Sequence, residues 1–251
     1  MTAQPLTLET DCRKNQETPV ANASTVKKED GSFKNATRIQ ESVTSMIERK
    51  ALLWLAVRIP PRINSDHLTL LGLVSMCLAS GSYVWARRNH AALLLVNLFL
   101  ALNWFGDSLD GTLARVRNRQ RPRYGFYVDH MIDSVGALLL MGGLALSGYV
   151  QWQIAAAMLV AFLLLSIETY LASYTLGIFR MSFAKFGPTE IRLLLALGNT
   201  VLWLRPDARV PRLHYRLFDF GGIVATIGMG AMLLVATAWH THRLYREERL
   251  P

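Results

Sequence analysis

Four aspartates in the middle of the chain have the spacing of a metal site within otherwise apolar sequence. They are Asp107, Asp110, Asp129 and Asp133. The first two are three residues apart and the last two are four apart, so each pair lies on one face of a helix. A carboxylate inside a bilayer costs roughly 2.5–3.5 kcal/mol or more, so four of them need compensation. Two such helices side by side would bring the carboxylates together, where one or two divalent cations could neutralise them.

The aspartates belong to a longer pattern, D-x2-D-G-x2-A-R, then nine residues, then G-x3-D-x3-D. Its eight fixed positions are Asp107, Asp110, Gly111, Ala114, Arg115, Gly125, Asp129 and Asp133. This pattern resembles the signature of the CDP-alcohol phosphatidyltransferases, also called CDP-alcohol phosphotransferases. The resemblance implies a six-helix membrane domain. It also implies a transferase that moves a substituted phosphate from a CDP-alcohol to an acceptor hydroxyl, releases CMP and serves phospholipid biosynthesis.

The same resemblance assigns a role to each position of the pattern. It implies that the four aspartates hold two divalent cations, Mg²⁺ or Mn²⁺, and that Asp133 is the favoured general base. It implies that the CDP site is lined by Gly111, Ala114, Arg115 and Gly125. The residue types agree, because Gly111 and Ala114 lie on the carboxylate face and leave room for a nucleotide, and Arg115 can meet a phosphate. The resemblance further implies a homodimer.

His130 is a second candidate for the base. The run VDHMIDS is similar to the FDHG-x-DS version in eukaryotic choline and ethanolamine phosphotransferases, where that histidine is a candidate base. Histidine changes its charge near neutral pH, which suits the role, although a hydrogen-bonded supporting role remains equally open. The run FGPTEIR at 186–192 is similar to a Gly-Pro-x-Glu element of the same enzymes. Both features favour an amino-alcohol substrate, whereas the chain is much shorter than those ten-helix enzymes.

The distribution of charge predicts an all-α polytopic membrane protein. The chain has 251 residues, 51% of them apolar, and a net charge of +9, with charged residues gathered at the ends and in short stretches. The apolar runs predict six transmembrane helices. These are residues 68–86, 91–113, 125–148, 153–175, 188–204 and 219–240. The aspartates fall near the end of the second span and the start of the third, and Asp66 is expected to cap the first.

The chain divides into four predicted parts. A disordered polar tail over 1–40 precedes a juxtamembrane, interfacial amphipathic helix within 41–62. The CDP-alcohol phosphotransferase membrane domain follows at 63–242, and a polar tail covers 243–251. Lys and Arg near the span ends favour cytoplasmic termini and therefore an active site that faces the cytoplasm. The small size favours a bacterial inner membrane.

Several features stay open at this level. The donor is either CDP-diacylglycerol, with a polar acceptor, or a CDP-amino alcohol, with diacylglycerol. Arg192, with Arg180 and Lys185, is a candidate for binding a phosphate-bearing acceptor, and Glu190 begins the same span. Glu168 lies deep in the fourth span and needs a partner or a function.

The alternatives of a different class are a divalent-cation transporter and a non-catalytic family member. The basic loop 115–123 is interpreted as a positive-inside anchor, so we expect no nucleic-acid partner.

Overall fold

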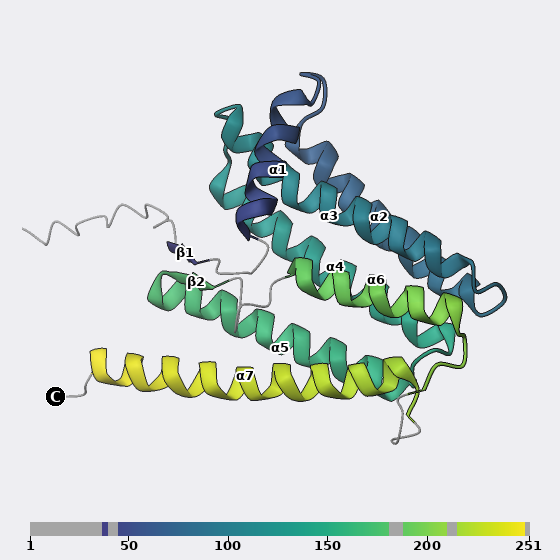
Figure 1. Ribbon diagram of the computed structural model, residues 1–251. Coiled ribbons are helices and arrows are strands. Elements are labelled where there is room, and N and C mark those ends of the chain that lie inside the picture. Colours follow the sequence, from purple (N-terminus) through teal and green to yellow (C-terminus); the bar gives the residue numbers. More distant parts are fainter. Residues whose placement is uncertain (1–36, 40–44, 181–187, 210–214, 249–251) are drawn as a thin grey trace, which may run out of the picture. The chain divides into compact units, whose positions relative to one another are not determined.

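The computed structural model describes residues 37–39, 45–180, 188–209 and 215–248, and in that part the chain is almost wholly helical. The helices are α1 (Ser45–Arg58), α2 (Ser65–Ala86), α3 (Ala92–Val116), α4 (Pro122–Ser147), α5 (Trp152–Leu176), α6 (Pro188–Leu204) and α7 (Leu217–Glu247) (Figure 1). Each predicted span is present as a helix, most of them longer by a few residues. The prediction of an all-α polytopic membrane protein is confirmed.

Length separates α6 from the other spans. Within the described residues, the helices long and apolar enough to cross a membrane are α2, α3, α4, α5 and α7. Helix α6 has the predicted bounds but only 17 residues, which at 1.5 Å per residue make about 26 Å. The hydrocarbon core of a bilayer is about 30 Å thick. The chain is therefore an integral membrane protein, and the count of six spans stays a prediction.

Two short strands were not expected. β1 (Thr37–Ile39) pairs in parallel with β2 (Ile178–Arg180), so that Thr37 lies opposite Ile178. Strand β1 falls within the tail predicted to be disordered up to residue 40, where pairing with β2 satisfies its backbone groups. The rest of that tail, residues 1–36, lies outside the described residues.

Two predicted helix ends differ from the observed ones. Helix α7 continues to Glu247, into the expected polar tail, and an ion pair between Arg243 and Glu247 at 2.8 Å supports its last turn. Asp66 does not precede α2 but lies in its first turn, where it pairs with Arg121. The residue before the helix is Asn64, whose backbone N–H donates to His67 Nδ1 at 3.0 Å.

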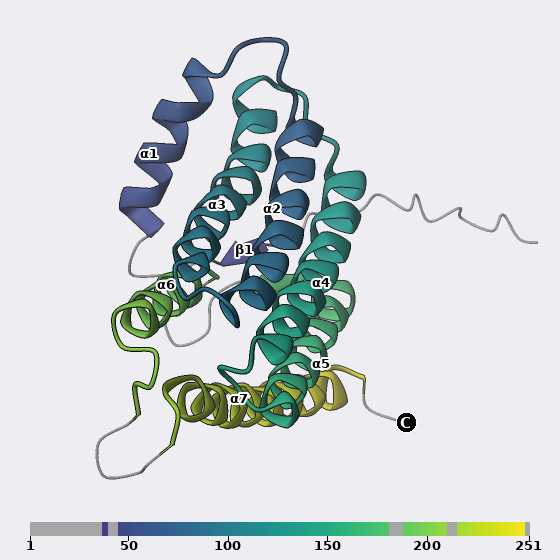
Figure 2. The ribbon, with the colours of Figure 1, turned by 90° about the vertical axis from the view of Figure 1, so that its right-hand side faces the viewer.

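Helix α2 packs against both α3 and α4 (Figure 2). Glycines allow the close approach. A Cβ added to Gly106 on α3 would lie 2.5 Å from the backbone oxygen of Leu68, and one on Gly143 of α4 would lie 2.6 Å from that of Ser80. Small residues at these positions let membrane helices meet backbone to backbone. The three helices thereby contribute most of the buried core around the ring of Tyr83.

We predict that Gly106→Ala destabilises the protein. The added methyl would meet backbone atoms, which cannot rotate away, and such overpacking costs about 1–3 kcal/mol. The melting temperature in detergent should fall by several degrees. Gly81→Ala on α2 is the matched control, because nothing lies within 4 Å of its added Cβ. Equal melting temperatures for the two variants would contradict the close packing of α2 on α3.

The outer helices attach to this unit from different sides. Helix α5 packs on α4 and α7, whereas α1 and α6 pack on α3. Glu168 of α5 pairs with His240 of α7, which supplies the partner expected for a carboxylate deep in a span. In α1, which the sequence predicts to lie at the membrane interface, Leu52 and Ala56 are buried, while Trp54 and Val57 are exposed. Its apolar side chains are thus divided between a packed face and an outward face.

Candidate active site

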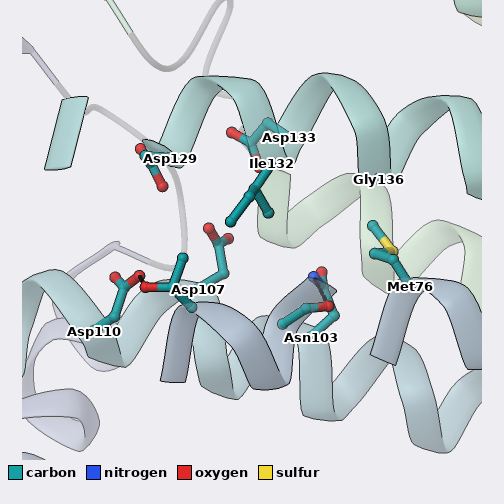
Figure 3. Close-up of a pocket in the computed structure, with 10 residues that line it drawn as sticks. Met76, Asn103, Asp107, Asp110, Asp129, Ile132, Asp133 and Gly136 are labelled. Atoms are coloured by element: carbon teal, nitrogen blue, oxygen red, sulfur yellow. Dashed lines mark hydrogen bonds between the residues drawn. The ribbon is translucent and has the colours of Figure 1, made fainter. Parts of the chain in front are cut away.

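The four aspartates line one pocket, between the second half of α3 and the first half of α4. Figure 3 shows Asp107 directed from α3 toward α4, and Asp129 directed from α4 toward α3. The remaining lining residues are Thr69, Gly72, Met76, Asn103, Ile132 and Gly136. About 20 Å³ of the pocket admits the centre of a water-sized sphere, which is room for one or two waters or ions. This space is too small for a nucleotide, which would have to lie outside it, toward the end of α3 and the start of α4.

The two carboxylates of α3 are held by different neighbours. Asp110 accepts a hydrogen bond from Thr69 Oγ1 of α2 at 2.6 Å, and its backbone oxygen accepts one from Ser65 Oγ at 3.0 Å. Asp107 accepts from Arg192 Nη2 of α6 at 2.7 Å. The exposed fractions of these last two side chains are 26% and 14%. The site thus joins two further structural elements to the motif helices: the start of α2, and the start of α6, which carries the guanidinium of Arg192.

The close packing of α2 on α3 positions this end of the pocket. Gly106 lies next to Asp107 in the chain, and its contact with the backbone of α2 brings Gly72 beside Asn103. Asn103 Nδ2 donates to the Gly72 carbonyl at 3.1 Å. This bond fixes which way the amide points, because only the nitrogen of the amide can donate.

Asn103 supplies an oxygen that suits a cation. Its side chain is 4% exposed, and Oδ1 has no hydrogen-bond partner within the described part of the chain. A buried acceptor of this kind normally has a partner. Together with four carboxylates, the pocket offers the hard oxygen donors that Mg²⁺ and Mn²⁺ prefer. The donor set therefore fits a divalent cation.

The carboxylates do not stand in the arrangement of a filled metal centre. Across the described ranges, no three Asp, Glu, His or Cys side chains are grouped closely enough to hold one ion. Asp107 pairs with Arg192, and Asp110 bonds to Thr69. Binding a cation would require the carboxylates of α3 and α4 to come closer together.

His130 does not line the pocket. It is 9% exposed and is absent from the pocket lining. Its ring stacks obliquely on Phe126, at 4.1 Å between centroids, and on Tyr170 of α5 at 4.5 Å. Its Nδ1 lies 3.4 Å from Asp129 Oδ2. His130 thus lies beside Asp129 and between two aromatic rings, whereas Asp133 lines the pocket and is exposed.

The other motif positions lie on the same two helices, in the last part of α3 and the first turn of α4. Gly111 follows Asp110, and the only neighbour that a Cβ there would meet within 4 Å in the described structure is the guanidinium of Arg115, at 3.5 Å. Nothing lies within 4 Å of a Cβ added to Gly125. Helix packing therefore does not require either glycine, in contrast to Gly106. Ala114 is partly buried, and Arg115 Nη2 donates to Thr112 Oγ1 at 3.0 Å.

Some residues of the site were missed from the sequence. Asn103 lies four residues before Asp107, and this helical spacing of polar residues could have identified it. Thr69 of α2, which also lines the pocket, carries no such local signal. Among the expected basic residues, Arg192 lies at the site, whereas Lys185 is outside the described residues. The Gly-Pro-x-Glu element also begins outside them.

Comparison with known proteins shows which protein family this chain resembles. A model of the CDP-alcohol phosphatidyltransferase family matches residues 65–239. The chain is also similar to an archaetidylinositol phosphate synthase of Pyrococcus horikoshii, with 31% identity over 139 residues. That alignment covers 55% of this chain and 65% of the relative, so less than two thirds of the relative's length is matched.

Proposed function

The chain belongs to the CDP-alcohol phosphatidyltransferase family, and from this premise we propose that it joins the lipid part of a CDP-lipid to a phosphorylated polyol. The observation that carries the proposal is the single pocket lined by all four motif aspartates. Enzymes of this family generally depend on divalent cations. We propose two of them, Mg²⁺ or Mn²⁺, held by Asp107, Asp110, Asp129 and Asp133, with Asn103 Oδ1 as a further oxygen nearby.

The nucleotide half of the donor would lie beside the motif glycines. In the described structure a Cβ added to Gly125 would meet nothing within 4 Å, and one added to Gly111 would meet only the guanidinium of Arg115, at 3.5 Å. A guanidinium binds phosphate oxygens through paired N–H groups. This arrangement supports a CDP site formed by Gly111, Ala114, Arg115 and Gly125 at the mouth of the pocket.

The reaction requires one proton transfer and one exchange at phosphorus. An acceptor hydroxyl gives its proton to the Asp133 carboxylate and forms a new bond to the lipid-bearing phosphorus. The bond between that phosphorus and the oxygen of CMP breaks, and CMP leaves with the electron pair. Bound divalent cations would supply neutralisation of the pyrophosphate charge. Asp133 is our choice of base because it lines the pocket and is exposed, while His130 is stacked between two rings.

The acceptor class is argued from Arg192 and from the relative. Arg192 lies beside Asp107, and a guanidinium carries five N–H donors. It can therefore hold the carboxylate and an acceptor phosphate at the same time. The name of the Pyrococcus protein refers to an inositol phosphate lipid, which is the product class that a phosphorylated polyol acceptor would yield.

We also propose cytoplasmic termini, a site that opens to the cytoplasm of a bacterial inner membrane, six spans that include α6, and a homodimer. Nucleotide substrates are available on the cytoplasmic side, and Lys and Arg are more numerous at the span ends of that side. Labelling of single cysteines from either side of sealed vesicles tests the orientation. A cysteine at Arg123 should react only from the cytoplasmic side.

The test of function is CMP release by the purified protein in detergent with Mg²⁺ or Mn²⁺. One arm offers a CDP-lipid with inositol phosphate, glycerol phosphate, inositol or serine, and the other offers CDP-choline or CDP-ethanolamine with diacylglycerol. Asp110→Asn serves as the blank. Metal-dependent CMP from the first arm with a phosphorylated polyol supports the proposal. CMP from the second arm alone would replace it with an amino-alcohol transferase. No CMP from either arm, with intact protein, would favour a divalent-cation transporter or a non-catalytic member.

We predict that Gly111→Ala and Gly125→Ala weaken use of the CDP-alcohol without weakening the fold. Each added methyl has room in the protein but would occupy space assigned to the nucleotide. The KM for the CDP-alcohol should rise roughly 5- to 150-fold, equivalent to about 1–3 kcal/mol of overpacking. Gly142→Ala on α4 is the matched control, since its added Cβ also meets nothing within 4 Å. If the KM for the CDP-alcohol is unchanged in both variants, the two glycines do not line the CDP site.

A further inference from the structure

Glu48 on α1 makes contacts for which the proposed reaction gives no reason. Its Oε1 accepts hydrogen bonds from Trp104 Nε1 at 2.8 Å and from Ser108 Oγ at 3.2 Å, both on α3. Thr189 Oγ1 on α6 donates to the same oxygen at 3.1 Å. One carboxylate of α1 is therefore bonded to two other helices that meet at the site.

The contacts of Glu48 surround the ion pair of the active site. Ser108 follows Asp107 in the chain, and Trp104 lies one turn before it on α3. Thr189 lies one turn before Arg192 on α6, so both point from the same face of that helix. Glu48 and the Asp107–Arg192 pair thus connect the same two helices at adjacent turns.

The other half of α6 is held independently of Glu48. Tyr83 OH of α2 donates to Asn199 Oδ1 at 2.9 Å, and Asn199 Nδ2 donates to Asn97 Oδ1 of α3 at 2.8 Å. Asn97 Nδ2 in turn donates to Thr200 Oγ1 at 3.1 Å. Because Tyr83 and Asn199 are fully buried, this network fixes the second half of α6. Loss of Glu48 would therefore act on the first turns of α6.

We propose that Glu48 is a positioning residue, which fixes the first turn of α6 so that Arg192 stays at Asp107 and faces the acceptor. The inference rests on the proposed function, because Arg192 has a role in turnover only there. In this proposal, α1 helps to form the part of the active site that binds the acceptor. Glu48 itself touches neither the pocket nor the reacting atoms.

The kinetic test compares two substitutions of Glu48. Glu48→Ala removes the acceptor oxygen, and a displacement of Arg192 by about 1 Å should lower kcat/KM for the acceptor up to about 10²-fold. Glu48→Gln keeps an oxygen that can accept from Trp104 and Thr189, so it should recover most of the activity. Arg49→Ala, at the next and exposed position of α1, is the control. Equal losses in Glu48→Ala and Glu48→Gln would overturn the hydrogen-bonding role.

A double variant tests whether Glu48 acts through Arg192. If it does, Glu48→Ala combined with Arg192→Gln should be no less active than Arg192→Gln alone. Contacting or linked residues show such non-additivity, whereas independent sites multiply their effects. If the double variant instead loses activity by the product of the two single losses, the proposal is overturned, even where Glu48→Ala alone has reduced activity.

Hydrogen–deuterium exchange tests the connection without turnover. Glu48→Ala should speed exchange of backbone amides in residues 189–193 and leave 198–204 at the wild-type rate, since the second half of α6 has its own network. Unchanged exchange at 189–193 together with wild-type kinetics would overturn the inference. Absence of CMP from the wild-type protein would instead reject the proposed function, and the exchange pattern would still decide whether Glu48 positions α6.

Discussion

Asp133→Asn is expected to lower CMP release by about 10²–10⁴-fold, the usual contribution of a positioned general base. Asparagine has nearly the same shape but cannot accept the hydroxyl proton. Asp133 lines the pocket and is exposed, so the substitution leaves no buried group without a partner. The measurement is CMP release under saturating substrates, with the melting temperature in detergent as the check of folding.

The control for this prediction is His130→Ala. The ring of His130 packs between Phe126 and Tyr170, so its removal should reduce stability and disturb Asp129 but leave measurable turnover. If Asp133→Asn keeps substantial activity and His130→Ala abolishes it in folded protein, His130 is the base. That result would also favour the amino-alcohol substrate that the similarity to choline and ethanolamine phosphotransferases indicates.

Arg192→Gln is expected to raise the KM for a phosphorylated acceptor by roughly 10- to 150-fold. Hydrogen bonds to charged groups contribute about 1.5–3 kcal/mol, and about 1.4 kcal/mol corresponds to tenfold in affinity. Arg192→Lys should recover only part of the loss, since a lysine keeps the charge without the paired N–H groups. The measurement is the dependence of CMP release on acceptor concentration.

The unphosphorylated polyol is the control acceptor for Arg192. Its KM, where turnover is measurable, should change little in Arg192→Gln, because it lacks the phosphate that the guanidinium is proposed to bind. If Arg192→Gln instead lowers kcat equally with both acceptors and leaves both KM values unchanged, Arg192 acts only through its pair with Asp107. The phosphate-binding role would then be wrong, and the assignment of the four aspartates would be unaffected.

The helices and the faces of the aspartates were predictable because both depend on local geometry. A residue three or four positions along a helix lies on the same face whatever the helix packs against, so the pairs Asp107–Asp110 and Asp129–Asp133 were placed correctly. Long apolar runs gave the helix bounds within a few residues. The assignment failed at β1 and at the end of α7, where pairing with a distant strand and an ion pair of polar residues extend the ordered structure.

The spacing of the motif within apolar sequence determined the family, the two helices of the site and the carboxylates that line it. Only the tertiary structure decided which distant groups complete it. Arg192 meets Asp107 across 85 residues, and Thr189 meets Glu48 across 141. It also decided that His130 contacts Tyr170 of α5, and that Gly106 serves packing while Gly111 has only the Arg115 guanidinium beside it in the described structure. These outcomes depend on which helices pack together and how closely, and the periodicity of a single helix contains no information about its neighbours.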